Sequence, residues 1–254
     1  MKHHPLLARL RAVREGGPLI EKLLKRDQPA TLTAAYAIAA ELISGQGIAG
    51  YKIGATSARG RQILRLKSPF YGRILADTLH RSPATVRLGR RSFAVEAEIG
   101  CELGTALPPR DTAYARGEVA AAVRKVVPLI ELNAPSFAQP FEVGGRSLIA
   151  DNGVNCGAII GSPGSMDLYT IQDAVVTMTM NGSRVARGTP PVAPDDPLSS
   201  MTWLANVLSR QGVGLEDGQV IATGTMTAPL DVSTDCMLEA DFGVLGRVQV
   251  NFLR

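Results

Sequence analysis

The chain has 254 residues, of which 45% are hydrophobic, 20% are charged and 5% are aromatic, and its formal net charge is +4. This composition is that of a globular protein with a sizeable core, and it excludes a disordered or low-complexity chain. The few aromatic residues and the scattered lysines and arginines argue against a nucleic-acid partner. The sequence has no apolar run long enough for a signal peptide or a membrane span, so we also expect no membrane partner.

Cysteine usage bears on the cellular compartment. The three cysteines, Cys101, Cys156 and Cys236, each lie in an apolar stretch. An odd number of such cysteines indicates reduced thiols, and we therefore expect a cytoplasmic protein.

The first part of the chain is predicted to be helical. Apolar residues recur at helical spacing over residues 6–14 and 20–24. Thr31 can cap a stronger helix that runs through Ile43, and Gly45 can end it. We therefore expect an N-terminal helical segment over residues 1–48 and a main domain over residues 49–254.

Short strands dominate the chain from Tyr51 onward. Residues 91–103 alternate clearly between two faces. One face carries Phe93, Val95, Ala97, Ile99 and Cys101, and the other carries Ala94, Glu96, Glu98 and Gly100.

The remaining predicted elements complete a mixed pattern. In chain order they are a helix over 111–126, a strand over 127–132, a hairpin over 174–187, a helix over 197–210 and strands over 219–223, 236–242 and 247–252. Asn181-Gly182 is typical of a hairpin turn, and Asp196 can cap the helix that follows it, with Gly212 past its end. Helices first and then mostly strands predict an α+β fold on a curved or sandwich-like sheet, without a regular βαβ repeat.

Three acidic residues are the strongest candidates for chemistry. Glu96 and Glu98 are two positions apart in a predicted strand, so their side chains point the same way, with Cβ atoms about 6.5 to 7 Å apart. Glu131 stands among apolar neighbours in the next predicted strand. Gathered carboxylates repel unless a cation, a shared proton or water separates them, and all-oxygen ligands favour Mg²⁺, Ca²⁺ or Mn²⁺. The pattern alone is also compatible with a second interpretation, in which Glu96 and Glu98 lie on a solvent-exposed strand face and Glu131 pairs with an arginine.

Lys52 and Asp77 are further candidates. Lys52 lies between glycines in GYKIG, which let a backbone approach a ligand, and it suits a proton donor or carboxylate clamp as well as a surface lysine. Asp77 follows an apolar run and suits a general acid or base as well as a turn former. The sequence has no GxSxG elbow or P-loop, and its histidines, His3, His4 and His80, make zinc chemistry a poor fit.

Seven segments in a fixed order carry a family resemblance. They are GYKIGATS (50–57), FYGRILAD (70–77), VEAEI (95–99), PLIE (128–131), ADNG (150–153), the stretch from DPL to WLAN (196–206) and GQVIATGT (218–225). Together they resemble the 2-keto-4-pentenoate hydratase and 4-oxalocrotonate decarboxylase family, within the fumarylacetoacetate hydrolase superfamily. The resemblance runs from about residue 45 to the C-terminus, and the N-terminal helices also fit it.

The resemblance implies a fold, a metal site and catalytic roles. The fold is a roll of mixed β-sheets with flanking helices, in which residues 49–254 form the catalytic domain. Mg²⁺ or Mn²⁺ would be held by Glu96, Glu98 and Glu131, and Lys52 and Asp77 would act on the substrate. The expected partners are a small 2-oxo acid substrate and further copies of the chain in a homo-oligomer. Some hydratases and decarboxylases of this family also associate with one another.

Five polar residues are candidate substrate contacts, although caps, turns and surface charge would explain them equally well. They are Thr56, Ser57, Arg73, Asn155 and Thr225. Many members have small hydroxyl residues after the Ala-Asp-Asn segment, where this chain has Gly-Val-Asn-Cys. Val154 offers no side-chain hydrogen bond and Asn155 does, so the departure leaves the substrate open.

The implied reaction is the addition of water to 2-hydroxypenta-2,4-dienoate or a similar 2-oxo acid, which gives a 4-hydroxy-2-oxo acid. A 4-oxalocrotonate-type decarboxylase is the first alternative, because both reactions stabilise negative charge on the C2 oxygen. Hydrolysis of a carbon–carbon bond ranks lower, since His80 lacks the paired motif that would activate water. A non-catalytic partner subunit ranks last, because Lys52, Asp77 and the three glutamates are intact.

Overall fold

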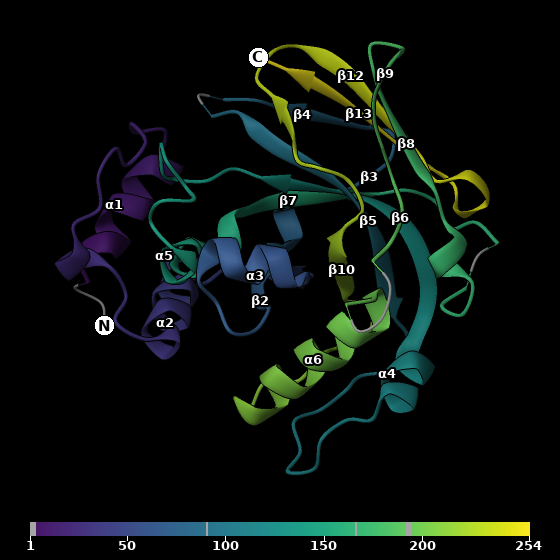
Figure 1. Ribbon diagram of the computed structural model, residues 1–254, viewed down its shortest axis with the longest axis horizontal. Coiled ribbons are helices and arrows are strands. Elements are labelled where there is room, and N and C mark those ends of the chain that lie inside the picture. Colours follow the sequence, from purple (N-terminus) through teal and green to yellow (C-terminus); the bar gives the residue numbers. More distant parts are fainter. Residues whose placement is uncertain (1–3, 90, 166, 192–194) are drawn as a thin grey trace.

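One large curved sheet holds most of the strands (Figure 1). The computed structural model describes residues 4–89, 91–165, 167–191 and 195–254. The strands of this sheet are β1 (Ile48–Gly54), β2 (Phe70–Leu75), β3 (Leu79–Arg81), β5 (Phe93–Leu103), β6 (Val123–Asn133), β7 (Asn155–Ile160), β10 (Val220–Thr225) and β11 (Leu230–Val232). They follow the order β2-β1-β10-β5-β6-β7-β3, and β11 pairs with β5 beside this path. The two longest strands, β5 and β6, therefore lie at its centre.

A smaller sheet adjoins the large one at the C-terminal end of the chain (Figure 1). Its strands are β4 (Ala84–Arg87), β8 (Val176–Met180), β9 (Ser183–Gly188), β12 (Cys236–Asp241) and β13 (Arg247–Leu253), in the order β4-β13-β12-β8-β9. The predicted hairpin is confirmed, because Asn181 and Gly182 join β8 to β9 with φ angles of 49° and 81°. Phe93 of β5 packs against Phe252 of β13 with ring centroids 5.9 Å apart, so the two sheets share a core.

The two predicted faces of β5 are present, although burial alternates only from Phe93 to Ala97 and every residue from Ala97 to Leu103 is buried. Val95, Ala97, Ile99 and Cys101 are completely buried in the main core. The opposite face of the strand carries Glu96 and Glu98, and it is this face that builds the site described below. Cys101, Cys156 and Cys236 are all free thiols.

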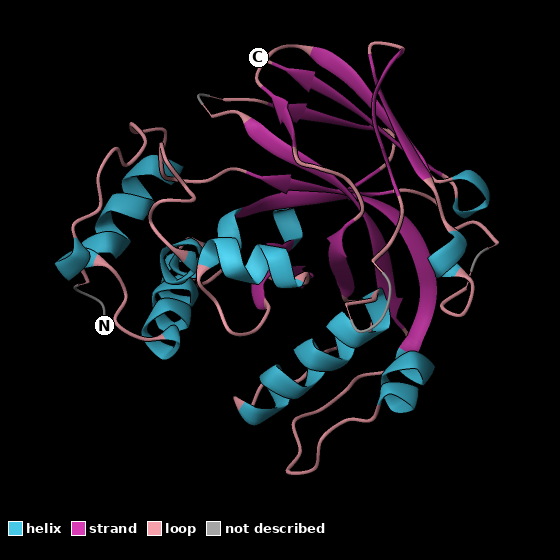
Figure 2. Ribbon diagram, in the orientation of Figure 1, coloured by secondary structure: helices cyan, strands magenta, loops and turns pink. Residues whose placement is uncertain are grey.

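The N-terminal helices gather at one end of the molecule (Figure 2). They are α1 (Pro5–Arg14) and α2 (Leu32–Leu42), and they share an apolar cluster with α5 (Gly145–Ala150). Thr31 caps α2 as predicted, by accepting a hydrogen bond from the amide of Ala34 at 3.1 Å. Arg14 at the end of α1 donates to the buried carboxylate of Asp151 at 3.1 Å. The helices are thus fastened to the rest of the chain, and a domain boundary after residue 48 stays a prediction.

Three more helices flank the large sheet: α3 (Ala58–Leu64), α4 (Arg116–Ala122) and α6 (Pro197–Arg210). As predicted, Asp196 caps α6 by accepting from the amide of Ser199 at 2.9 Å, and Gly212 beyond its end has a φ of +72°. Short 3-10 helices complete the structure: η1 (Lys25–Asp27), η2 (Ala76–Thr78), η3 (Asn152–Val154), η4 (Ile171–Asp173) and η5 (Gly243–Leu245).

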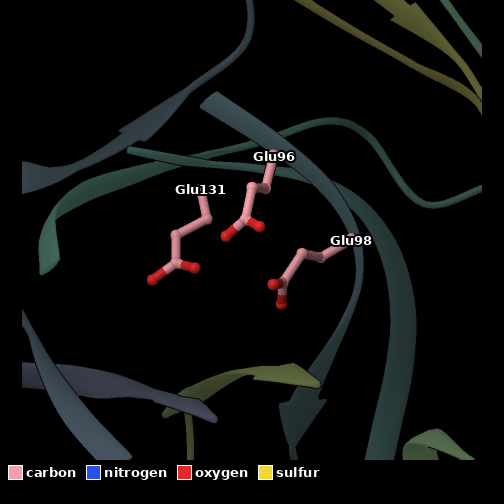
Figure 3. Close-up of side chains that lie close together, drawn as sticks. All are labelled: Glu96, Glu98 and Glu131. Carbon is pink, nitrogen blue, oxygen red and sulfur yellow. The ribbon is translucent and has the colours of Figure 1, made fainter. Parts of the chain in front are cut away.

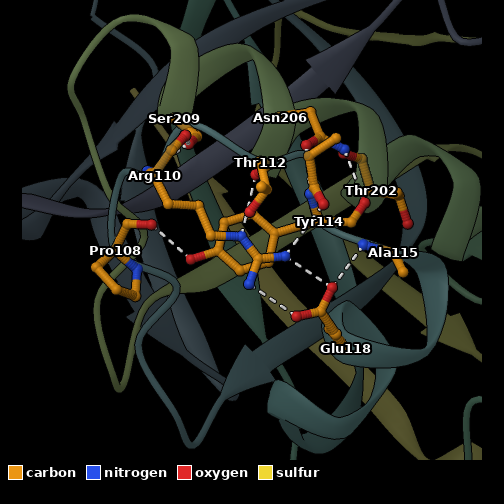
Figure 4. A network of polar contacts seen from close by, with 10 residues as sticks. Pro108, Arg110, Thr112, Tyr114, Ala115, Glu118, Thr202, Asn206 and Ser209 are labelled. Atoms are coloured by element: carbon orange, nitrogen blue, oxygen red, sulfur yellow. Dashed lines mark hydrogen bonds and ion pairs between the residues drawn. The ribbon is translucent and has the colours of Figure 1, made fainter.

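A polar network ties the loop before α4 to α6 (Figure 4). Asn206 of α6 accepts from the amide of Tyr114 at 2.7 Å and donates to its carbonyl at 3.1 Å. Arg110 makes two hydrogen bonds to the carboxylate of Glu118, at 2.8 and 2.7 Å. Its guanidinium also lies 3.7 Å from the ring centroid of Tyr114, and Ser209 bonds to both backbone groups of Arg110. The loop therefore holds a fixed position against the helix.

The α+β class is confirmed, and two helix predictions are wrong. The predicted helix over residues 20–24 is extended chain, because Ile20 pairs with Phe137 in a bridge. Of the helix predicted over residues 111–126, only Arg116–Ala122 is helical. The chain turns into β6 at Val123 because the pairing with β5 continues along its whole length. The helices α3 and α5 carried no expectation from the sequence. None of the helices within the described residues is long and apolar enough to span a membrane.

Candidate active site

Three glutamates meet on one face of the central strands (Figure 3). Glu96 of β5 is directly opposite Glu131 of β6 in the antiparallel register. Glu98 is two residues along β5, and the period of a strand returns it to the same face. One carboxylate oxygen from each residue lies within 4.8 Å of the others. The predicted convergence of these three side chains is therefore a feature of the sheet register.

The surroundings of these carboxylates oppose their ionisation. Glu98 and Glu131 are each 1% exposed, and Glu96 is partly buried. Burial, followed by the charge of Glu131, raises the pKa of Glu96 from 4.5 to about 7. Burial and the two neighbouring glutamates raise the pKa of Glu98 well above its usual value. A nearby cation would reverse this effect, because it favours the charged form of each acid.

Lys52 of β1 is the one cation that reaches the cluster among the residues lining its cavity. Its ammonium nitrogen lies 3.2 Å from Oε1 of Glu131 and donates to Oδ1 of Asn133 at 3.1 Å. The side chain is buried and passes 5.4 Å from the ring centroid of Phe70. Lys52 is therefore held by an acid, an amide and an aromatic ring, and it is no surface lysine.

Amide groups complete the hydrogen bonding of the carboxylates. Asn133 donates to Oε2 of Glu96 at 2.9 Å and to Oε2 of Glu131 at 3.1 Å. Asn155 donates to Oε1 of Glu131 at 3.0 Å, and the backbone amide of Gly224 donates to Glu98 at 2.9 Å. Each of these donors stabilises a carboxylate in its charged form and fixes its orientation.

Backbone strain occurs beside Lys52. Asn152, Gly153 and Val154 all have left-handed φ angles, of 54°, 63° and 60°. Such a conformation costs on the order of 1–3 kcal/mol for a residue like valine. A Cβ atom on Gly153 would lie 3.0 Å from Cε of Lys52 and 3.1 Å from the ring of Phe70. The turn therefore packs a glycine against the lysine stem and restricts its position.

A cavity of about 190 Å³ opens onto the three glutamates. Its polar lining comprises Lys52, Thr56, Ser57, Glu96, Glu98, Glu131 and Thr225. Its apolar rim is formed by Ile63 and Leu64 of α3 and by Phe141, and both Ile63 and Phe141 are strongly exposed. Gly224 has a φ of +119°, and a Cβ atom there would lie 2.7 Å from Oγ1 of Thr56. Glycine at this position therefore lets two walls of the cavity approach each other.

Known proteins are similar to this chain in sequence and fold, although no family model matches it. A 2-oxo-hept-4-ene-1,7-dioate hydratase from Escherichia coli is 28% identical over 88% of this chain and 87% of its own length. A 2-keto-4-pentenoate hydratase from Paraburkholderia xenovorans is 28% identical over 82% of this chain and 77% of its own. The solved 4-oxalocrotonate decarboxylase from Pseudomonas putida G7, in complex with magnesium and adipate, superposes with a TM-score of 0.84 at 25% identity. That match covers 98% of this chain and 97% of the decarboxylase.

The chain is thus similar, over most of its length, to proteins of the 2-keto-4-pentenoate hydratase and 4-oxalocrotonate decarboxylase family. The hydratases of this family are lyases, and the fold is the mixed-sheet roll expected from the resemblance. The family resemblance drawn from the seven sequence segments is thus confirmed.

The structure brings most of the predicted site residues together. Lys52, the three glutamates, Thr56, Ser57 and Thr225 all line the cavity. Asn155 is buried behind it and bonds to Glu131, so it supports a carboxylate instead of facing the cavity. Ser57 also caps α3 by accepting from the amide of Gly60 at 3.1 Å. The roles assigned to these residues stay predictions.

Two predicted residues are placed elsewhere. Arg73 is paired with Tyr51 in the register of β1 and β2, one position away from Lys52 and Gly72. Its side chain therefore points to the opposite face of the sheet, away from the glutamates. Asp77 lies in η2 with an exposed side chain and is not among the residues that line the cavity.

Asn133 and the apolar rim were not predicted from the sequence. Asn133 is two residues after Glu131 and therefore shares its face, so the spacing could have revealed it. Ile63 and Phe141 carried no such signal, because loops and a short helix bring them to the cavity. Of the remaining histidines, His80 lies in β3 and His4 caps α1, whereas His3 lies outside the described residues.

Proposed function

We propose that the protein is a divalent-metal-dependent hydratase that adds water to 2-hydroxypenta-2,4-dienoate or a similar 2-oxo acid. The product is a 4-hydroxy-2-oxo acid. The observation that carries this proposal is the buried cluster of Glu96, Glu98 and Glu131 with Lys52 beside it. The hydratases among the relatives support the choice of reaction.

The donor set fits a divalent cation. Three ionised carboxylates against one ammonium leave two negative charges uncompensated in a buried site, and this is the charge of one such ion. Buried charges of one sign are costly without a partner. Oxygen ligands favour hard cations, and we propose Mg²⁺ or Mn²⁺ held by the three glutamates. When bound, the ion supplies Lewis-acid stabilisation of negative charge on the substrate's C2 oxygen.

The chain's own groups then have distinct tasks. The ammonium group of Lys52 is buried in the wall of the cavity, and we assign it the protonation of C5 of the dienol, which yields the 2-oxo-3-enoate as the proton of the 2-hydroxyl group passes back to Lys52. Water then adds at C4, with its proton returning to the substrate at C3. Asn133 fixes the side-chain positions of Lys52, Glu96 and Glu131 through three hydrogen bonds. A role for Asp77 in moving protons rests on the family resemblance alone.

The walls of the cavity favour a substrate with a single carboxylate. Helix α3 turns Gly60, Ile63 and Leu64 toward the cavity at helical spacing. Its Arg61 instead bonds to the carbonyl of Thr56 and to Asp195. Among the residues that line the cavity, Lys52 is the only cation and is already committed to Glu131. A second carboxylate at the far end of a dioate would therefore meet an apolar rim.

The alternative reactions have less support than hydration. A 4-oxalocrotonate-type decarboxylase is supported by the close structural match, but its substrate carries two carboxylates. Carbon–carbon hydrolysis has less support, because no histidine lies among the residues that line the cavity. A non-catalytic role conflicts with the intact acid cluster. We also propose a homo-oligomer and association with a paired enzyme, which rest on the resemblance. A cytoplasmic location rests on the cysteine pattern.

Metal-dependent turnover of 2-hydroxypenta-2,4-dienoate tests the proposal. The loss of dienol absorbance is followed with and without Mg²⁺ or Mn²⁺, and the product is weighed by mass spectrometry. We expect the gain of one water only with metal, and its loss in Glu98→Ala and Lys52→Ala. Release of carbon dioxide from 2-oxo-3-hexenedioate, without hydration of the dienoate, would instead assign a decarboxylase.

A further inference from the structure

A second and larger cavity lies on the other face of β1 and β2. Its volume is about 450 Å³, and helices α2 and α6 form its two sides. Tyr36, Tyr71 and Trp203 supply aromatic walls, and Leu66 and Val207 add aliphatic surface. This size and apolar lining are typical of sites for small organic ligands. Because Lys52 points to the opposite face, the cavity is separate from the three glutamates.

Two stacked tyrosines form the floor of this cavity. The rings of Tyr36 and Tyr71 have centroids 4.3 Å apart and are nearly parallel, with an interplanar angle of 15°. The hydroxyl of Tyr36 accepts from the amide of Tyr71 at 3.2 Å, and the hydroxyl of Tyr71 donates to Gln211 at 2.8 Å. The rings are thus fixed in place, and a flat ligand would meet a rigid surface.

Arg73 brings a positive charge to the same cavity. Its guanidinium carbon lies 5.5 Å from the ring centroid of Tyr71, and the side chain lines the cavity. Within the described part of the chain, Arg73 forms no ion pair with a carboxylate. Glu216 is close enough to Tyr51 for its charge to affect that tyrosine, but it is exposed and forms no ion pair with Arg73. A half-buried arginine without an acid beside aromatic rings is suited to an anionic ligand.

The side chain of Arg73 is not what anchors its strand. The amide and carbonyl of Arg73 bond to the side chain of Asn152 at 2.9 and 2.8 Å. These backbone contacts remain whatever side chain stands at the position. The guanidinium has the hydroxyls of Tyr51 and Tyr71 beside it but no acid, so it can still bind an anion, and its removal is compatible with folding.

We propose that this cavity binds a small aromatic carboxylate, with Arg73 holding the carboxylate and the aromatic walls holding the ring. A guanidinium matches a carboxylate with two parallel hydrogen bonds, and the partly exposed rings of Tyr36 and Trp203 offer aromatic surface to a flat ring. A ligand with only a carboxylate would not contact the aromatic walls, and a ligand with only a ring would not bind Arg73. The site does not depend on the reaction proposed above, because it lies on the other face of the sheet.

The single tryptophan of the chain makes a direct test available. Trp203 lines this cavity, so its fluorescence reports on a ligand bound there. Benzoate is titrated into the metal-free full-length protein, with acetate and benzyl alcohol as the probes that lack the ring or the charge. We expect a saturable change with benzoate, and weaker responses to the other two.

Variants then separate this site from its neighbours. Trp203 also borders a smaller cavity that contains Lys67, so Lys67→Met is the matched control. We expect Arg73→Met to weaken benzoate binding at least about tenfold and Arg73→Lys to recover only part of it. Lys67→Met and the metal-site variant Glu98→Gln keep wild-type binding. A missing benzoate response, a response that survives in Arg73→Met, or one lost in Lys67→Met or Glu98→Gln overturns the proposal.

Discussion

The ammonium nitrogen of Lys52 lies 3.2 Å from Oε1 of Glu131, and both side chains are buried. This contact joins the only cation among the lining residues to one of the three acids that would hold the metal. The proton of Lys52 and the charge of the cluster are therefore coupled through the same carboxylate. A cation bound by the glutamates would compete with the ammonium for Glu131 and weaken this ion pair.

Replacing Lys52 separates proton transfer from metal binding. We expect Lys52→Met to lower kcat for dienoate hydration by about 10²- to 10⁴-fold, which is the usual contribution of a positioned acid. Metal affinity stays or improves, because a cation that competes for Glu131 is removed. Lys125→Met is the matched control, since Lys125 is an exposed lysine in β6. A Lys52→Met enzyme with wild-type kcat would remove Lys52 from the mechanism.

The apolar rim predicts substrate selectivity. Ile63 is 49% exposed at the cavity mouth, where no lining residue could pair with the distal carboxylate of a dioate substrate. We expect Ile63→Arg to shift kcat/KM toward 2-hydroxyhepta-2,4-diene-1,7-dioate, relative to the pentadienoate, by about tenfold or more. Val185→Arg, on the exposed hairpin strand β9, serves as the control for added charge. A wild-type enzyme that already prefers the dioate would contradict the single-carboxylate assignment.

The network between α6 and the loop before α4 predicts a stability effect without a catalytic one. Asn206→Ala leaves the amide and carbonyl of Tyr114 without their partner. The expected loss in the free energy of unfolding is about 1–3 kcal/mol, measured by urea denaturation. Asn251→Ala, on the exposed face of β13, is the control and should have little effect. A change in kcat of Asn206→Ala at a temperature where it remains folded would show that the loop reaches the site.

The ion pair in the same network predicts an acid-dependent contribution to stability. Hydrogen bonds from Arg110, followed by the amide of Ala115, lower the pKa of Glu118 from 4.5 to about 2. Because the pKa is lower in the folded state, the stabilisation is complete above about pH 4.5 and is lost as the pH falls toward 2. Glu118→Gln should therefore be less stable than the wild type at pH 7, with a difference that shrinks below pH 4.5. A difference in urea midpoint that is independent of pH would reject this cause.

Local signals in the sequence predicted several elements correctly. The caps at Thr31 and Asp196 and the turn at Asn181-Gly182 depend on neighbouring residues only, and each is present. The convergence of Glu96 and Glu98 also follows from the period of one strand. The apolar neighbours of Glu131 made it a candidate, but its position opposite Glu96 depends on the register of the two strands, which has no local signal.

Long-range contacts account for what the sequence did not predict. Residues 20–24 have a helical apolar pattern, yet Ile20 pairs with Phe137 more than a hundred positions away. Arg124 has a good helix propensity, but it belongs to β6 because β5 offers a strand partner. The register of β1 against β2 decides that Lys52 faces the glutamates and Arg73 does not. None of these pairings has a local signature.

The most direct measurement of the central claim is the titration of Mn²⁺ into metal-free protein by calorimetry at neutral pH. We expect one ion per chain, bound by Glu96, Glu98 and Glu131. Binding should be lost in Glu98→Gln and kept in Glu102→Gln, whose carboxylate on the same strand pairs with Arg124 instead. The return of dienoate hydration on adding Mn²⁺ should follow the same occupancy. Absence of Mn²⁺ binding in the wild type, or equal binding in Glu98→Gln, would contradict the account.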